Sequence, residues 1–150
     1  MHIRPATPDD LHTLLTFEQG VILAERPFDP TLRPDPIYYY DLNHLLHDAD
    51  SILIVAEDAG HLIASGYATI RIGKPYFEYD RYAYLGFMFV DPAYRGKGVN
   101  QLIMSELANW CTSKNIREMK LQVYHDNVSA IRAYEKVGFK QDLIEMRFRV

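Results

Sequence analysis

The sequence contains a single cysteine, Cys111, and no long uninterrupted run of apolar residues. One cysteine cannot form a disulfide within the chain, and no basic segment precedes an apolar run at the N-terminus as in secreted proteins, so a reducing cytoplasm is the expected location. No stretch approaches the roughly 18 apolar residues that a membrane-spanning helix needs. We therefore expect a soluble, cytoplasmic protein with no membrane partner.

Positive charge is also scarce, because 16 Lys and Arg residues stand against 20 Asp and Glu residues and leave a formal charge of −4. This balance argues against binding of nucleic acid through the overall field of the protein. No Cys or His pair has the spacing of metal ligands, so no metal is expected. At 150 residues, of which 48% are apolar, the chain fits one domain over residues 1–150.

Apolar periodicity and turn residues predict a mixed α/β fold with helices packed on a central sheet. Helices are expected over residues 8–26, 35–46, 99–110 and 128–136. Strands are expected over residues 2–4, 51–57, 62–72, 82–90, 118–124 and 143–149. The prolines between residues 27 and 36 predict a loop after the first helix, and Gly138 should close the last helix in a left-handed conformation.

Two glycines in Arg95-Gly96-Lys97-Gly98 stand between a predicted buried strand and a predicted helix. Backbone N–H groups are unpaired at such a helix start, glycine lets a phosphate approach the backbone, and Arg95 and Lys97 add positive charge. A dinucleotide fingerprint is excluded because Gln101 stands where a third small residue is needed, and residues 93–100 do not spell a P-loop. The loop is a candidate phosphate site of another kind, with a purely conformational use of glycine as the alternative.

The segment Val90-Asp91-Pro92-Ala93-Tyr94-Arg95-Gly96-Lys97-Gly98-Val99 resembles the cofactor loop of the GNAT acetyltransferase superfamily. In that superfamily a strand ending in Val-x-Pro is followed by Arg or Gln, two residues, Gly, one residue, and Gly or Ala. A second segment typical of the superfamily follows at the expected distance. Its matching residues are Asn127, Ala130, Tyr134 and Gly138-Phe139. Asn100 replaces a small residue of the pattern, and it would either crowd the pyrophosphate or donate a hydrogen bond to it.

The resemblance implies a mixed sheet of about six to seven strands with helices on both faces. It also implies that the strands over residues 82–90 and 118–124 splay apart and admit acetyl-CoA as co-substrate. The implied cofactor contacts are Met88, Phe89, Val90, Arg95, Gly96, Lys97, Gly98, Val99, Asn100 and Asn127. For Asn127, a role as helix N-cap is an equal alternative, and both roles are compatible.

Acetyl transfer to an amine requires a neutral nucleophile and a proton for the departing thiolate. Tyr134 resembles the proton donor of the superfamily. A phenol with a pKa of about 10 can protonate a departing thiolate at little cost, because the pKa of a thiol is about 8.5. The alternative for Tyr134 is a half-buried packing residue. No base is assigned, since residues 82–90 contain no carboxylate and bulk water can accept the proton of many amines. The candidates are Glu25, Glu78, Asp80 and His125.

The acceptor site is expected in the N-terminal region, where a Pro-rich loop and two groups of tyrosines would form its wall. Its candidate contacts are Glu25, Tyr38, Tyr39 and Glu78. Aromatic walls suit a hydrophobic or cationic acceptor. The predicted function is transfer of an acetyl group from acetyl-CoA to a primary amine of a small or amino-acid-like molecule. A degenerate acyl-CoA-binding regulatory module and a protein lysine or N-terminal acetyltransferase are the alternatives, and a homodimer is left open.

Overall fold

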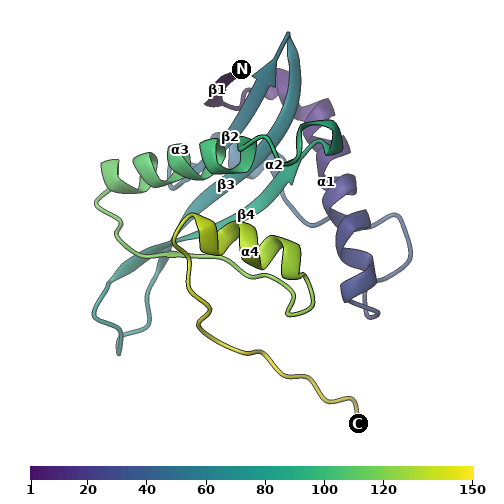
Figure 1. Ribbon diagram of the computed structural model, residues 1–150. Helices are drawn as coiled ribbons and strands as arrows, with labels where there is room; N and C mark the ends of the chain where they lie inside the picture. The colour runs from purple at the N-terminus through teal and green to yellow at the C-terminus, as the bar shows by residue number, and fades with distance from the viewer.

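A computed structural model describes all 150 residues and shows a five-stranded sheet with helices on both faces (Figure 1). The strands are β1 (His2–Pro5), β2 (Ser51–Asp58), β3 (His61–Ile72), β4 (Arg81–Val90) and β5 (Met119–Lys120). They lie in chain order, antiparallel except for the parallel pair β4 and β5. The helices are α1 (Leu11–Glu25), α2 (Leu42–His47), α3 (Val99–Ser113) and α4 (Val128–Lys136), with 3-10 turns η1 (Pro8–Asp10), η2 (Arg26–Phe28) and η3 (Pro92–Tyr94).

Two hydrophobic cores lie on opposite faces of the sheet. Along β2, Ile54 and Ala56 belong to one core, whereas Leu53 and Val55 belong to the other, as the two-residue period of a strand requires. Helix α3 supplies the first core, and α1 and α2 supply the second. The predicted α/β class with helices on both faces is thereby confirmed. None of the helices is both long and apolar enough to cross a membrane.

The sheet has five strands rather than the six to seven that were expected. Of residues 118–124, only Met119–Lys120 joins a ladder, and residues 143–149 form no strand. The alternation of apolar and polar residues shows that a segment can form a strand, but a strand also needs a neighbouring backbone to pair with. Residues 143–149 have no such pairing partner. None of their backbone groups forms a hydrogen bond with another backbone group.

The second helix is shorter than the one predicted over residues 35–46. It begins only after Asp41, whose carboxylate caps it. The preceding segment is held by the fully buried carboxylate of Glu18 on α1, which accepts the N–H groups of Tyr39 at 2.9 Å and Tyr40 at 2.7 Å. These N–H groups therefore bind a distant side chain instead of entering a helix, which sequence periodicity does not reveal.

A bulge in β4 turns one aromatic side chain to the opposite face of the sheet. The register with β3 shifts between Ser65 and Tyr67, and Phe87 of β4 has a φ of 55°. The hydroxyl of Ser65 donates to the carbonyl of Phe87 at 3.1 Å and holds this conformation. Leu85 therefore packs in the core under α3, whereas Phe87 packs in the core under α1. Such bulges re-aim side chains and commonly lie beside active sites.

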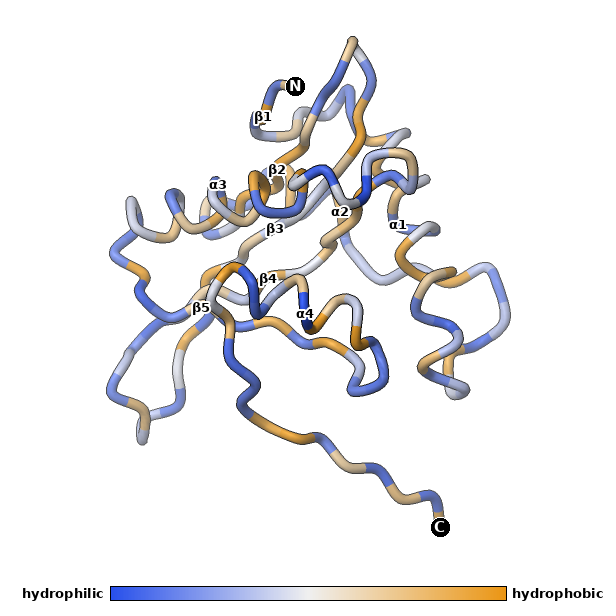
Figure 2. The backbone as a smooth tube through the Cα atoms, viewed as in Figure 1, coloured by the Kyte–Doolittle hydropathy of each residue, from blue (hydrophilic) through white to orange (hydrophobic).

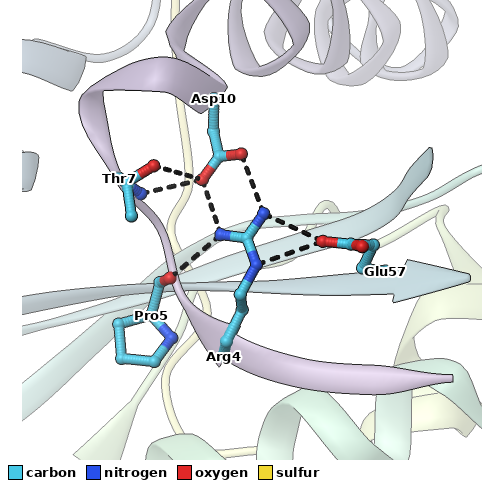
Figure 3. Close-up of polar contacts among 5 residues, drawn as sticks. All are labelled: Arg4, Pro5, Thr7, Asp10 and Glu57. Atoms are coloured by element: carbon cyan, nitrogen blue, oxygen red, sulfur yellow. Dashed lines mark hydrogen bonds and ion pairs between the residues drawn. The ribbon is translucent and has the colours of Figure 1, made fainter. Parts of the chain in front are cut away.

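A charged network ties β1 to η1 and β2 (Figure 3). The Arg4 guanidinium donates to both carboxylate oxygens of Asp10, at 2.8 and 3.0 Å, and to Glu57 Oε2 at 3.1 and 3.2 Å. Asp10 also accepts the N–H of Thr7 at 2.8 Å. The hydrogen bonds from Arg4 hold the pKa of Asp10, which is 8% exposed, below its usual value.

Asp10→Asn is expected to lower the free energy of unfolding by about 1–3 kcal/mol at neutral pH, because Arg4 loses a charged partner. The folded pKa of Asp10 is depressed, so its contribution is complete above the unfolded pKa and is lost as the pH falls through the folded pKa. Urea unfolding should therefore give converging stabilities for variant and wild type in strong acid. Asp9→Asn is the control, because the Asp9 side chain is exposed, and an equal loss there would contradict the assignment.

Candidate active site

A glycine loop and η3 connect β4 to α3. Gly96 and Gly98 have φ values of 74° and 78°, in the left-handed region that glycine adopts without strain, and Gly98 is the N-cap of α3. A Cβ atom on Gly96 would meet no atom within 4 Å, and one on Gly98 would meet only Gln101 Oε1 at 3.7 Å. Both glycines therefore border open space, which leaves room for a ligand against the backbone.

The backbone donors of this loop have no partner in the protein. No N–H group of residues 96–101 donates to another backbone group, and the first that does is Leu102, which donates to the Gly98 carbonyl at 3.2 Å. Six consecutive donors thus meet the positive end of the α3 dipole. Anionic phosphate groups are the ligands that such a helix start binds.

Two basic side chains flank these donors. The Lys97 ammonium lies 4.8 Å from the ring centroid of Tyr94, and Arg95 Nε donates to the Val90 carbonyl at 3.3 Å. Both residues are exposed, so their charges remain accessible to an anion. The side chain of Asn100, at the second position of α3, forms no hydrogen bond within the protein and is available to the same ligand.

Beside the loop, β4 and β5 separate. Their ladder pairs only Ala83 with Met119 and Tyr84 with Lys120. Beyond Tyr84, the strand β4 continues to Val90 without a partner on this edge. The splayed pair that the sequence implied is therefore present, and the edge of β4 offers backbone donors and acceptors to an extended ligand.

The side chains at the end of β4 are not part of this open edge. Met88 packs in the core with α3, next to Gly66, and the Phe89 ring stacks on Phe17 of α1 with centroids 4.4 Å apart. Met88 and Phe89 can therefore contact a ligand in the gap through their backbone groups.

Helix α4 carries Tyr134 on its inner side. Tyr134 is half-buried, and its ring packs edge-on against Phe139 with centroids 6.1 Å apart. Burial, with a smaller contribution from the negative charge of Glu25, raises the pKa of Tyr134 to about 12. The phenol thus keeps its proton throughout the neutral range. At the start of α4, Asn127 acts as the N-cap, with its Oδ1 accepting the N–H of Ala130 at 3.3 Å, as one of its two predicted roles requires.

Glu25 is the carboxylate whose negative charge adds to the increase in the Tyr134 pKa. It is half-buried at the last position of α1. Burial raises its pKa, the Tyr39 hydroxyl opposes part of this increase, and the nearby Asp29 carboxylate adds to it. Burial also raises the pKa values of five tyrosines, and the charge of Glu25 adds to each increase. These are Tyr39, Tyr40, Tyr84, Tyr124 and Tyr134. Glu25 therefore lies within electrostatic reach of a cluster of phenols drawn from four parts of the chain.

Tyr124 and Asp29 belong to this cluster, although the sequence analysis did not select them. The Tyr124 hydroxyl donates to Asp29 Oδ2 at 2.8 Å, and the Phe28 and Tyr124 rings stack with centroids 6.2 Å apart. Hydrogen bonds from Thr31 and Tyr124 lower the pKa of Asp29 to about 2. These contacts join the loop after α1 to the segment after β5. No local sequence signal indicates them, because the partners lie far apart in the chain.

Two other expected contacts lie elsewhere. Tyr38 is 69% exposed and lines a surface pocket of about 440 Å³ formed by α1, the segment before α2 and the start of α2. Glu78 is exposed in the connection between β3 and β4. Tyr39 lines the same pocket and also lies close to Glu25, whose charge adds to the increase that burial causes in the Tyr39 pKa. Of the four expected acceptor contacts, the fold thus brings Glu25 and Tyr39 together.

Comparison with known proteins agrees with this geometry. The family model described as "Acetyltransferase (GNAT) family" matches residues 18–139, which include both the glycine loop and α4. The chain belongs to the GNAT acetyltransferase family. Within the GNAT family it is similar to the N-alpha-acetyltransferase RimI of Mycobacterium tuberculosis, with 34% identity over 144 residues that cover 95% of this chain and 80% of that protein. It is also 40% identical over 85 residues to an uncharacterized protein of Mycobacterium leprae, but spans only 22% of that longer chain.

Solved structures share the GNAT fold of this chain. A tetramutant of the BH1408 protein from Bacillus halodurans superposes with a TM-score of 0.90 over 100% of both chains, at 18% identity. A predicted acetyltransferase from Clostridium acetobutylicum, crystallised with acetyl-CoA, superposes with a TM-score of 0.77 over 99% of this chain and 95% of that one, at 19% identity. In this GNAT protein, no three His, Cys, Asp or Glu side chains come together in a way that could hold a metal ion.

Proposed function

We propose that this chain is an N-acetyltransferase that moves the acetyl group of acetyl-CoA to a primary amine by direct attack. The observation that carries the proposal is the run of six unpaired N–H groups at residues 96–101, which opens beside the unpaired edge of β4. A pyrophosphate fits the first feature and an extended pantetheine arm fits the second. Acetyl-CoA contains both groups, with its thioester at the far end of the arm.

In the proposed reaction, Tyr134 donates one proton and Glu25 accepts one. Acetyl-CoA supplies the thioester, whose carbonyl carbon forms a bond to the amine nitrogen as its bond to sulfur breaks. Tyr134 gives its proton to the departing thiolate, and solvent restores that proton. Before the attack, the ammonium form of the acceptor loses one proton to Glu25, directly or through water, and Glu25 passes it to solvent. The nitrogen loses its second proton to solvent as the amide forms. The products are an N-acetylated amine and CoA with a free thiol.

The acceptor is proposed to enter beside Glu25 and Tyr39. The carboxylates of Glu25 and Asp29, with the surrounding phenols, suit an acceptor that arrives as an ammonium ion. A small or amino-acid-like amine meets this requirement. The similarity to RimI favours a peptide N-terminus as a second candidate acceptor.

The test is release of free thiol from acetyl-CoA in the presence of small amines, amino acids and peptides with free N-termini. Thiol release that depends on one of these amines is expected. Acetyl-CoA and CoA should also raise the melting temperature, since a ligand at one hundred times its Kd stabilises the fold by about 2.7 kcal/mol. NAD should not. Stabilisation by CoA without turnover of any amine would instead identify an acyl-CoA-binding regulatory module.

Glu25→Gln is expected to lower kcat/KM by about 10- to 100-fold, because the amide cannot accept the proton of the amine. Glu25 is active as the base only when ionised, so wild-type kcat/KM should fall as the pH drops through its raised pKa, and the variant should lose this dependence. The matched control is Glu78→Gln, which removes an exposed carboxylate that the sequence also suggested. An equal effect of both substitutions on kcat/KM would refute the assignment of the base.

A further inference from the structure

Arg71, near the end of β3, contacts one of the tyrosines that the charge of Glu25 reaches. Its guanidinium carbon lies 3.9 Å from the centroid of the Tyr84 ring. The side chain is exposed, and its N–H groups form no hydrogen bond and no ion pair within the protein. A cation–π contact attracts the guanidinium to the ring without using its N–H groups as donors to an oxygen. Arg71 is therefore held at Tyr84 while its donors stay available to an anion.

The Arg71 side chain lies on the face of the sheet that α1 covers. In the register of β3 with β4, Arg71 stands opposite Tyr82 and diagonal to Tyr84. Tyr67, an even number of residues before Arg71 on β3, packs in the core with α1, and such side chains of one strand share a face. Figure 2 shows this end of β3 entering the loop that projects at the lower left, next to β5. Arg71 is thus on the same face as Glu25, the last residue of α1.

Tyr84 marks the point at which β4 and β5 separate. It is the last residue of β4 that pairs with β5, and its hydroxyl donates to Gln122 Oε1 at 3.2 Å on the segment after β5. The gap that is proposed to admit the arm of acetyl-CoA begins directly beyond this pair. Arg71 therefore lies beside the start of the gap, on the face from which the acceptor is proposed to enter.

Two opposite charges act on Tyr84. Burial raises the pKa of Tyr84, the positive charge of Arg71 opposes this increase, and the negative charge of Glu25 adds to it. Both charges are thus near one phenol, but they form no ion pair with each other, so neither neutralises the other. A ligand that carries an ammonium group and a carboxylate would match both.

The neighbouring cation, Lys120, is less suited to bind such a carboxylate. Its ammonium lies 4.6 Å from the ring centroid of Phe77, 4.9 Å from that of Tyr79 and 4.8 Å from that of Tyr82. A hydrogen bond with Tyr79 is the largest cause of the increase in the Lys120 pKa. The charge of Lys120 is therefore already surrounded by side chains of the protein, whereas Arg71 contacts one ring.

We propose that Arg71 binds a carboxylate of the acceptor, and that the acceptor is consequently a free amino acid rather than a peptide N-terminus. The inference rests on the proposed function, because it names the acceptor class of the same site. A guanidinium binds a carboxylate through two parallel charge-assisted hydrogen bonds. The first residue of a peptide has a neutral amide in place of this carboxylate, so Arg71 favours the free amino acid.

The first test measures binding without turnover. Protein saturated with CoA is titrated in a calorimeter with L-amino acids, with ω-amino acids of increasing length, and with the carboxamide of each. At least one acid should bind about 10- to 100-fold more tightly than its own carboxamide. Arg71→Gln should abolish this preference, and Arg71→Lys should retain part of it, because lysine keeps the charge but not the two parallel bonds. The proposal is overturned if no acid binds more tightly than its carboxamide, or if the preference survives Arg71→Gln.

Arg81→Gln is the matched control. Arg81 is also exposed, at the start of β4, but its guanidinium donates to the Lys114 carbonyl at 3.1 Å. The substitution removes the same charge from the same pair of strands and should leave the binding of acids and carboxamides unchanged. An equal loss of the preference in Arg81→Gln would show an effect of net charge and would overturn the assignment to Arg71.

The second test measures thiol release with the same acids and carboxamides, and it separates this inference from the proposed function. Arg71→Gln should lower kcat/KM for the acid by about 10- to 100-fold, mainly through KM, and leave the carboxamide unaffected. If wild type acetylates carboxamides as well as acids, the chain is an acetyltransferase but Arg71 does not select the acceptor. If acids bind through Arg71 and no thiol is released, the proposed function fails while the assignment of the carboxylate site stands.

Discussion

Replacement of Tyr134 by Phe is expected to lower kcat by about 100-fold while the affinity for CoA stays nearly constant, because only the proton for the departing thiolate is lost. The ring itself packs against Phe139, and phenylalanine preserves that contact. Since the pKa of Tyr134 is about 12, the wild-type phenol remains protonated far above neutral pH, and kcat should show no decline at moderately alkaline pH from this residue. Steady-state kinetics with saturating amine measures both effects.

Tyr124→Phe provides the comparison, because it removes another hydroxyl from the same cluster. That hydroxyl donates to Asp29 and so positions the loop after α1. Its loss should raise the KM for the acceptor more than it lowers kcat. Wild-type kcat in a folded Tyr134→Phe variant would remove Tyr134 from the mechanism and leave it as a packing residue. A loss of CoA affinity with unchanged saturated kcat would assign the Tyr134 hydroxyl to binding instead.

Local periodicity predicts those parts of the fold whose partners are interchangeable apolar surfaces. The strands β2 and β3 and the helix α3 lie within a few residues of their predicted bounds, because extended apolar runs or helical apolar spacing suffice to place them on the sheet. The second helix fails for a different reason. The buried carboxylate of Glu18 keeps residues 38–40 out of a helix by accepting the N–H groups of Tyr39 and Tyr40. In the sequence, this glutamate cannot be distinguished from a solvated residue on the surface of a helix. The expected last strand fails because residues 143–149 pair with no other backbone segment, which their alternating pattern alone does not reveal.

The same distinction applies to the active site. The phosphate loop is local, so its glycines and its position at the start of α3 can be predicted from a short stretch of sequence. The acceptor side is assembled from the end of α1, the segment after β5 and α4. Glu25 was one of several carboxylates of equal standing in the sequence, and only the folded chain sets it beside Tyr39 and within electrostatic reach of Tyr134. The single-domain organisation, the cofactor contacts and the cytoplasmic location stay predictions.

Gly98→Val is expected to raise the Kd for CoA by about 100-fold, equivalent to about 2.7 kcal/mol of binding free energy. At this position a Cβ atom would project into the open space before the unpaired N–H groups, where the pyrophosphate is proposed to lie. Calorimetric titration with CoA measures the effect. Because the φ of Gly98 is 78°, valine there is also strained and should cost the fold about 1–3 kcal/mol. A loss of affinity therefore has to be separated from a loss of folded protein.

Gly60→Val is the matched control for this strain. Gly60 has a φ of 79°, its Cβ would meet no atom within 4 Å, and it lies in the turn between β2 and β3, outside the glycine loop. The two variants should lose similar amounts of unfolding free energy in urea, because they force the same side chain into the same backbone conformation. Only Gly98→Val should then lose CoA affinity. If both variants bind CoA as wild type does, or if both lose affinity equally, the pyrophosphate does not lie against Gly98 and the cradle has to be sought elsewhere on the open edge of β4.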